Sequence, residues 1–251
     1  MGDNQSIFMK NAKILKDTTA QVLKCRKFIS ENKKIWEKDW YVRVSPSAFR
    51  AVSLNNETPL MGFTESGRKD ISKDVLLIDF QNGKPKVPKK PVPERRVQCW
   101  LIKHALQNSM DIKPVLFTDE NYCEKLLFCL DEVTLYNELQ GVRCDILAVA
   151  IHGKEAFPVV IEIKSAHVLN DAVDELTDFC KILKDHPVEL NDLLHACLGQ
   201  SDIETIDHNH ITKMIIWNKE DGISKSTRET FEKNNIELRE YQWKLDFHNH
   251  G

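Results

Sequence analysis

Two short apolar runs joined by a turn constrain this chain more than any other feature. Residues 144–151 read CDILAVAI and residues 158–164 read PVVIEIK, with HGKE directly after the first run. Runs of this length, rich in branched side chains, favour strands, and a short spacer containing glycine favours a hairpin. The sequence therefore predicts two adjacent antiparallel strands.

Three ionisable residues stand in these otherwise apolar strands. Asp145 opens the first strand, and the alternation of side chains puts Glu162 and Lys164 on one face at the end of the second. Burying an unpaired charge is costly, so such groups require a partner or a metal ion. Two carboxylates form a hard-oxygen site for Mg²⁺ or Mn²⁺, and the lysine can orient or deprotonate a water beside the ion. Such a set of groups can hydrolyse a phosphodiester bond.

Helical spacing brackets the two strands. After Pro93, the apolar residues Val97, Trp100, Leu101 and Ala105 recur on one face, which predicts a helix over 93–108 with Trp100 in the core. The remaining expectations are a helix or loop over 120–130, a strand over 133–139, a helix over 168–183, a strand over 213–217, a helix over 224–235 and an edge strand over 236–243. This order is typical of an α/β sandwich with a mixed sheet.

An acidic residue, a hairpin and then Glu-x-Lys, here Asp145 and Glu162-Ile163-Lys164, resembles the PD-(D/E)xK, or restriction-endonuclease-like, nuclease superfamily. The resemblance covers about residues 93–243 and implies a three-layer sandwich with a mixed central sheet. It also implies that Asp145, Glu162 and the Ile163 carbonyl hold Mg²⁺, with Lys164 at the attacking water. Glu94, in the first turn of the leading helix, matches the place where many relatives carry a further acid.

The chain departs from the family's pattern at two places. Cys144 stands where the family name expects proline, a change that many active members share. Glu175 and Phe179 occupy the stretch in which several exonuclease and repair branches carry a Gln-to-Tyr pairing. The resemblance therefore assigns the chain to no branch.

A proline- and lysine-rich segment near residue 90 predicts a boundary between two parts. Residues 1–90 are expected to form a small α+β extension and a linker, with helices before residue 40 and strands near 40–44 and 75–80. Residues 91–251 are expected to form the nuclease-like domain. Basic residues at the boundary are candidates for phosphate contacts, with a solvated spacer as the alternative: Lys89, Lys90, Arg95 and Arg96.

The charge balance and the cysteines limit which partners and which cellular compartment the sequence favours. Acidic residues number 38 and basic residues 35, so any nucleic-acid surface must be a local patch. Seven cysteines without a Cys-x-x-Cys pair argue against a disulfide framework or a zinc ribbon and favour a reducing, cytoplasmic location. Since no apolar run approaches the roughly 18 residues that span a bilayer, no membrane contact is expected.

Other polar residues are weaker candidates for the catalytic site. Glu138 is an alternative to Glu94 as the extra acid, although a glutamate near a turn usually faces solvent. The triplets at 208–210 and 248–250 read His-Asn-His, but adjacent residues point in different directions, so neither is expected to form the site of the nuclease class with that name. His152 and His167 flank the proposed centre, and Lys181 and Lys184 lie on the helix after it; solvation is the expected role of all four.

The sequence thus favours a metal-dependent nuclease acting on DNA. Cleavage of RNA, or an inactive nucleic-acid-binding module on the same fold, remains the alternative. The resemblance also leaves a homodimer open, because relatives often pair to cut two strands.

Overall fold

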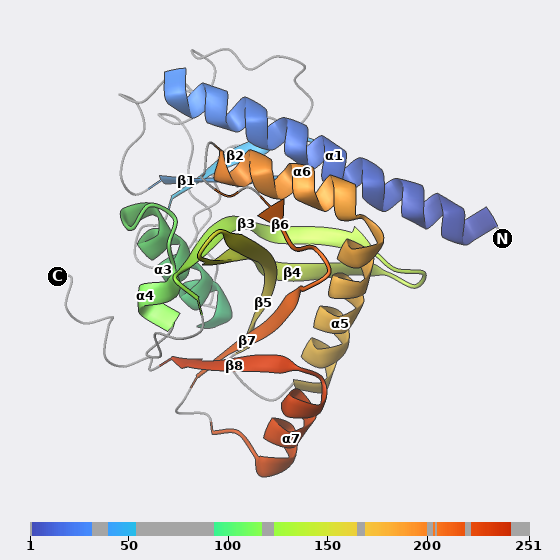
Figure 1. The fold of residues 1–251 in the computed structure, drawn as a ribbon, viewed down its shortest axis with the longest axis vertical. Coiled ribbons are helices and arrows are strands. Elements are labelled where there is room, and N and C mark those ends of the chain that lie inside the picture. The colour runs from blue at the N-terminus through green and yellow to red at the C-terminus, as the bar shows by residue number, and fades with distance from the viewer. Residues whose placement is uncertain are drawn as a thin grey trace.

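The computed structural model describes residues 2–31, 40–53, 93–116, 123–164, 169–199, 203, 205–218 and 222–241. Its helices are α1 (Gly2–Glu31), α3 (Pro93–Gln107), α4 (Lys113–Leu116), α5 (Leu169–Asp185), α6 (Pro187–Leu198) and α7 (Lys225–Lys233). Its strands are β1 (Trp40–Val44), β2 (Phe49–Ser53), β3 (Lys125–Tyr136), β4 (Gly141–His152), β5 (Glu155–Lys164), β6 (Thr205–Ile206), β7 (Thr212–Asn218) and β8 (Ile236–Tyr241). Figure 1 shows their arrangement.

The main sheet is open and mixed. Its order is β3-β4-β5-β7-β8, with the short β6 also paired to β5. The pairs β3–β4 and β4–β5 are antiparallel, whereas β5–β7 and β7–β8 are parallel. The predicted α/β class with a mixed sheet is therefore confirmed, and the last strand lies at the edge as predicted.

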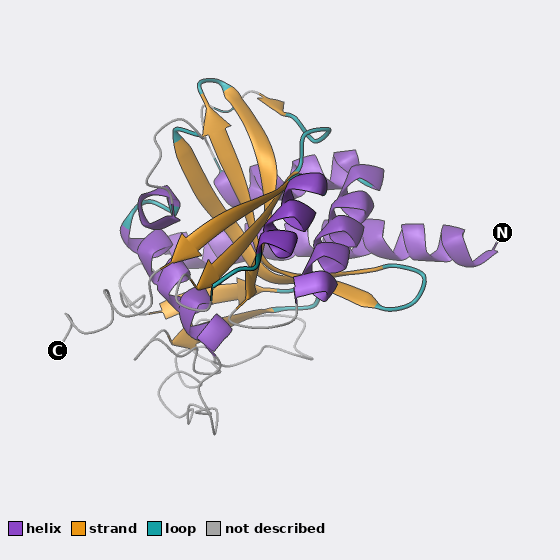
Figure 2. Cartoon of the chain, turned by 90° about the horizontal axis from the view of Figure 1, so that it is seen from below, coloured by secondary structure: helices purple, strands orange, loops and turns teal. Residues whose placement is uncertain are grey.

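Helices cover both faces of this sheet (Figure 2). Helices α1, α5 and α6 enclose one core with the sheet, the α5-side core, around side chains such as Phe179 and Leu193. Helix α3 and the short α4 enclose the other, the α3-side core, around Leu101 and Ile112. Because both faces are buried, the central strands are apolar on both sides rather than alternating.

This burial explains where the sequence prediction was wrong. In the described part of 120–130, β3 begins at Lys125, instead of a helix or loop. The run from Leu126 to Leu130 is almost continuously apolar, and a bulge between Phe128 and Leu130 breaks its alternation. Periodicity alone does not separate such a strand from a buried helix. Helix α6 was missed, although Pro187 begins it and its buried leucines have helical spacing.

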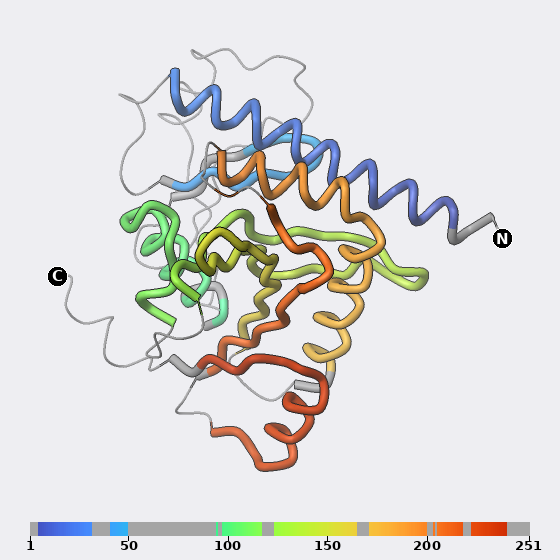
Figure 3. The backbone as a smooth tube through the Cα atoms, in the orientation of Figure 1, coloured from blue at the N-terminus to red at the C-terminus, as the bar shows by residue number. Residues whose placement is uncertain are grey.

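The N-terminal helix packs on the same core as the later elements. Helix α1 lies along α6 (Figure 3) and buries Leu15 and Val22 in the α5-side core. The Arg26 guanidinium donates hydrogen bonds from Nη1 to the carbonyl oxygens of Ala196 and Cys197, at 2.8 and 2.9 Å. These are end carbonyls of α6, which have no partner within the helix. Arg26 thus caps α6 from α1.

A buried cluster of hydrogen-bonded side chains connects β1 to β3. The Tyr41 hydroxyl donates to Oδ1 of Asp131, and Arg43 Nε donates to Oδ2, both at 2.8 Å. Asp131 is only 1% exposed, so these donors compensate its lost hydration. Residues before the predicted boundary therefore contact the main sheet directly. The predicted boundary near residue 90, the proline- and lysine-rich linker expected over 83–93 apart from Pro93, and the expected strand over 75–80 lie outside the described residues.

Gly199, after the last turn of α6, is expected to lose stability when it gains a side chain. Its φ is +71°, and a Cβ there would lie 1.9 Å from Arg26 Nη2. We expect Gly199→Ala to lower the free energy of unfolding by about 2–3 kcal/mol in chemical denaturation, through backbone strain and loss of the Arg26 cap. Gly153→Ala is the matched control, because Gly153 also has a positive φ (+61°) but nothing lies within 4 Å of its Cβ position. Equal losses in the two variants would show that the Arg26 contact is unimportant.

No described helix is long and apolar enough to cross a membrane. All seven cysteines lie in the described part of the chain as free thiols, and only Cys197 is partly exposed.

Candidate active site

The antiparallel ladder between β4 and β5 stops where the predicted acids begin. Its last pair is Ile146 with Ile161, and the next residue along each strand is Asp145 or Glu162. Here the Ile163 N–H donates to Oδ2 of Asp145 at 2.8 Å, so the carboxylate docks onto the β5 backbone. The structure thus brings Asp145 to the Glu162–Lys164 segment, as the sequence predicted.

Glu162 and Lys164 share a face of β5, and their charged groups are in contact. Lys164 Nζ lies 2.8 Å from Glu162 Oε1 and 3.7 Å from Oε2 of Glu175, on α5. Glu162 is buried at 5% exposure, and Lys164 is partly buried. Glu175 therefore joins this group, while Phe179, one turn further along α5, is fully buried in the core.

The electrostatics of the group show an excess of negative charge. Burial raises the pKa of the Glu162 carboxyl to about 8, and the charge of Asp145 adds to this shift. Burial also raises the pKa of Asp145 to about 6, although the Ile163 N–H opposes the change. Burial alone would lower the pKa of Lys164, but the Glu162 carboxylate outweighs it and raises that pKa overall. Two carboxylates that resist ionisation beside one ammonium form a site that a divalent cation would stabilise.

Helix α3 supports Asp145 from the opposite side of the sheet. Gln98 is 2% exposed, and its Nε2 donates to the Asp145 carbonyl oxygen at 3.0 Å. Gln98 is not among the residues predicted for the site; its signal in the sequence was an amide on the apolar stripe of the helix, next to Val97. Glu94 is partly buried one turn earlier, and the helical spacing puts it on the face that Gln98 presents to β4.

The strand opposite Asp145 is distorted. Asp131 pairs with Ile146 and Val133 with Cys144, which leaves Glu132 facing Asp145. Glu132 has a φ of +55°, in the left-handed region. At this point β4 changes its buried face, because Ile146 belongs to the α3-side core and Cys144 to the α5-side core. Backbone irregularities of this kind often accompany functional sites, where they re-aim a side chain.

The donor set suits a hard cation that keeps water ligands. Among the residues that the structure describes, no three His, Cys, Asp or Glu side chains converge as a metal-binding group. Mg²⁺ is often held by one or two carboxylates, with waters and substrate phosphates completing its octahedron. Asp145 and Glu162 fit that pattern as two protein ligands. Ile163 contributes its N–H to Asp145; its carbonyl was the group that the resemblance assigned to the ion.

Several other predicted residues lie away from this group or outside the described chain. Lys89, Lys90, His167 and the triplet at 248–250 are outside it, and Arg95 and Arg96 are described only as backbone in the first turn of α3. Exposed positions elsewhere on the surface are occupied by Glu138, His152, Lys181 and Lys184. In the 208–210 triplet, His210 is exposed, with its ring 5.0 Å from that of Phe157. Trp100 packs against the α3-side core, as predicted.

A scan of the chain against models of known protein families finds no match, and no curated protein matches it either.

Proposed function

We propose that this chain is a Mg²⁺-dependent nuclease with a restriction-endonuclease-like fold, acting on DNA. The observation that carries the proposal is the Asp145 carboxylate bound to the Ile163 N–H, between Glu162 and Lys164. The mixed sheet is consistent with it, since the PD-(D/E)xK resemblance implies a mixed central sheet. The distortion at Glu132 gives the site a backbone feature that a plain surface ion pair does not require.

In this proposal Asp145 and Glu162 hold the ion from neighbouring strands. Ile163 holds the carboxylate of Asp145, and Gln98 holds its backbone carbonyl. Asp145 is therefore already positioned before the ion binds. The ion would supply Lewis acidity toward the phosphate and lower the pKa of its bound water, with Mn²⁺ able to replace Mg²⁺. Glu94 would support the same side from α3.

Lys164 acts as a cation rather than as a base in this mechanism. Its raised pKa keeps it protonated at neutral pH, so it donates hydrogen bonds to the attacking water and offsets negative charge on the phosphate. The Glu162 and Glu175 carboxylates hold the ammonium at the end of β5. Lys164 thus orients the water and takes no proton from it, which narrows the two roles considered from the sequence.

Cleavage assays with wild type and Lys164→Ala test the proposal. Linear DNA, circular DNA and RNA are each incubated with Mg²⁺, Mn²⁺ or EDTA. We expect metal-dependent loss of DNA with the wild type and a rate lower by about 100-fold with the variant, because one preorganised positive charge is removed. Lys125→Ala, at an exposed position of β3, is the matched control and is expected to keep the wild-type rate.

Preferential loss of RNA would retain the chemistry and correct the substrate. Equal nucleic-acid binding by wild type and Lys164→Ala, with no cleavage in either metal, would contradict the proposal and identify a binding module.

A further inference from the structure

Three cysteine thiols from separate elements interact where α1, α6 and β3 pack together. They are Cys25 on α1, Cys129 on β3 and Cys197 in the last turn of α6. Cys129 belongs to the α5-side core, and the partly buried Cys197 packs against that core. Cys25 is buried in a smaller cluster beside β1 and β2. The proposed nuclease chemistry uses none of the three, so this thiol cluster is a separate feature of the molecule.

A β-bulge gives Cys129 its position. Phe128 pairs with Ala148 and Leu130 pairs with Leu147, so Cys129 is the extra residue that β3 inserts between two neighbouring pairs. As a result, Cys129 and Leu130 both lie in the α5-side core, although adjacent residues of a strand normally point to opposite faces. Bulges often re-aim a side chain. Here the bulge places the thiol on the side of the sheet that α6 covers.

The thiols of Cys129 and Cys197 are joined by a hydrogen bond. This bond and burial raise the pKa of Cys129 well above its usual range, which identifies Cys129 as the donor, because a bond donated by the protonated form opposes ionisation. Its other acceptor is the carbonyl oxygen of Leu127, 3.7 Å from Cys129 Sγ. Cys197 is partly exposed, whereas the other six cysteines, all in the described chain, are buried. The two sulfurs are therefore in contact, and Cys197 is the one that solvent reaches.

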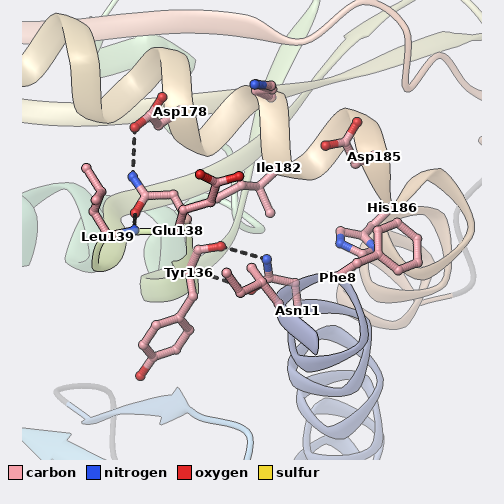
Figure 4. Close-up of a pocket in the computed structure, with 12 residues that line it drawn as sticks. Phe8, Asn11, Tyr136, Glu138, Leu139, Asp178, Ile182, Asp185 and His186 are labelled. Atoms are coloured by element: carbon pink, nitrogen blue, oxygen red, sulfur yellow. Dashed lines mark hydrogen bonds between the residues drawn. The ribbon is translucent and has the colours of Figure 1, made fainter. Parts of the chain in front are cut away.

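Helix α1 is also held on β3 and α6 near its start. Asn11 Nδ2 donates to the Tyr136 carbonyl oxygen at 2.8 Å, and the Tyr136 N–H donates to Asn11 Oδ1 at 2.9 Å (Figure 4). The Phe8 ring lies against that of His186, the residue before α6, with centroids 4.3 Å apart. A cavity of about 540 Å³ lies here, between the start of α1, the β3–β4 turn and the end of α5; His186 lines it, and none of the three described thiols does. The meeting of the thiols therefore depends on packed elements and not on a loop.

We propose that Cys197 and Cys129 form a reversible oxidation site, which closes to a disulfide bond in response to a hydroperoxide. The Cys197 sulfur attacks the terminal peroxide oxygen, the O–O bond breaks, and Cys197 becomes a sulfenic acid while the peroxide leaves as water or an alcohol. The Cys129 sulfur then attacks the Cys197 sulfur, the S–O bond breaks, and the hydroxyl leaves as water with the Cys129 proton. The two thiols lose two electrons and two protons, and the peroxide is reduced by the same two electrons.

Cys129 is better placed than Cys25 to resolve the sulfenic acid. A hydrogen bond holds Cys129 against Cys197, whereas Cys25 interacts with Cys197 through charge. Burial, with the charge of Cys197 adding to it, raises the pKa of Cys25 to about 12, so Cys25 stays a thiol. The proposal is independent of the nuclease activity.

Hydrogen peroxide added to the full, folded chain tests the proposal. After the reaction, free thiols are alkylated in denaturant and the intact mass is measured. We expect the chain to lose two hydrogen atoms and two of its seven free thiols, and dithiothreitol to restore both. Trypsin digestion without reduction should leave peptide 126–143, which carries Cys129, joined to peptide 185–213, which carries Cys197.

Two variants identify the pair. Cys197→Ser, at a partly exposed position, is expected to form no disulfide, while the matched control Cys25→Ala should form it as the wild type does. Peptide 185–213 joined to the dipeptide 25–26, a disulfide-linked dimer, or oxidation of Cys197 to a sulfinic acid without any joined peptides would each overturn the proposal. Loss of two thiols in Cys197→Ser would overturn it as well.

Discussion

The Asp145→Asn variant is expected to cleave DNA about a thousandfold more slowly than the wild type in Mg²⁺, a loss of roughly 4 kcal/mol of transition-state stabilisation. The amide oxygen of asparagine can still accept the hydrogen bond that the Ile163 N–H donates at 2.8 Å. The fold should therefore survive, while the negative charge that holds the ion is lost. Single-turnover cleavage at saturating DNA measures the effect on the chemical step.

Glu132→Gln is the matched control for this experiment. Glu132 faces Asp145 across the β3–β4 ladder but forms its ion pair with Arg143, at 2.8 Å. The substitution removes one negative charge beside the site without removing a proposed ligand, so cleavage should stay within about tenfold of the wild type. A rate for Asp145→Asn no lower than that of Glu132→Gln would exclude Asp145 as a metal ligand.

The second large effect concerns stability. Glu162→Gln is expected to make the metal-free protein more stable than the wild type at pH 8.5, by an amount on the order of 3 kcal/mol, while abolishing cleavage. Folding raises the pKa of Glu162 from 4.5 to about 8, mainly through burial. The folded state therefore holds this proton more tightly than the unfolded state. As the pH rises from about 5 to above 8, the wild type loses stability that the uncharged glutamine retains.

Urea denaturation in EDTA at several pH values measures this difference. Asp145, whose pKa burial raises to about 6, contributes a smaller loss in the same direction at lower pH. Adding Mg²⁺ should flatten the wild-type dependence, because the ion replaces the proton and stabilises the native state by mass action. Glu155→Gln, at the exposed first residue of β5, is the control. If the free energy of unfolding of Glu162→Gln changed with pH in parallel with that of the wild type, the raised pKa of the buried Glu162 carboxyl would be contradicted.

The central strands and their flanking helices could be predicted because local pattern and tertiary role agree there. The runs at 144–151 and 158–164 became β4 and β5, and the helices expected over 93–108, 168–183 and 224–235 became α3, α5 and α7. The strands expected at 213–217 and 236–243 became β7 and β8. At α3 an apolar period follows Pro93, and at β4 and β5 the two apolar runs flank a turn.

The rest depended on contacts distant in sequence. The capping of α6 by Arg26 and the hold of Tyr41 and Arg43 on Asp131 join residues 88 to 171 positions apart, and no local pattern indicates them. Within the site, spacing alone grouped Glu162 with Lys164. The approach of Gln98 to the Asp145 carbonyl follows from the packing of α3 against the sheet.

The left-handed conformation of Glu132 had no signal in the sequence, since glycine or asparagine is the usual residue there. The same holds for the cavity at His186. Its walls come from α1, the β3–β4 turn and the end of α5, three segments that only the fold brings together.

Titration of the protein with Mn²⁺, followed by electron paramagnetic resonance, tests most directly whether Asp145 and Glu162 share one divalent ion. We expect one bound Mn²⁺ per chain in the wild type, displaced by excess Mg²⁺, and an Mn²⁺ affinity lower by at least about tenfold in both Asp145→Asn and Glu162→Gln. Mn²⁺ affinity that is the same in the wild type and in both variants would contradict it.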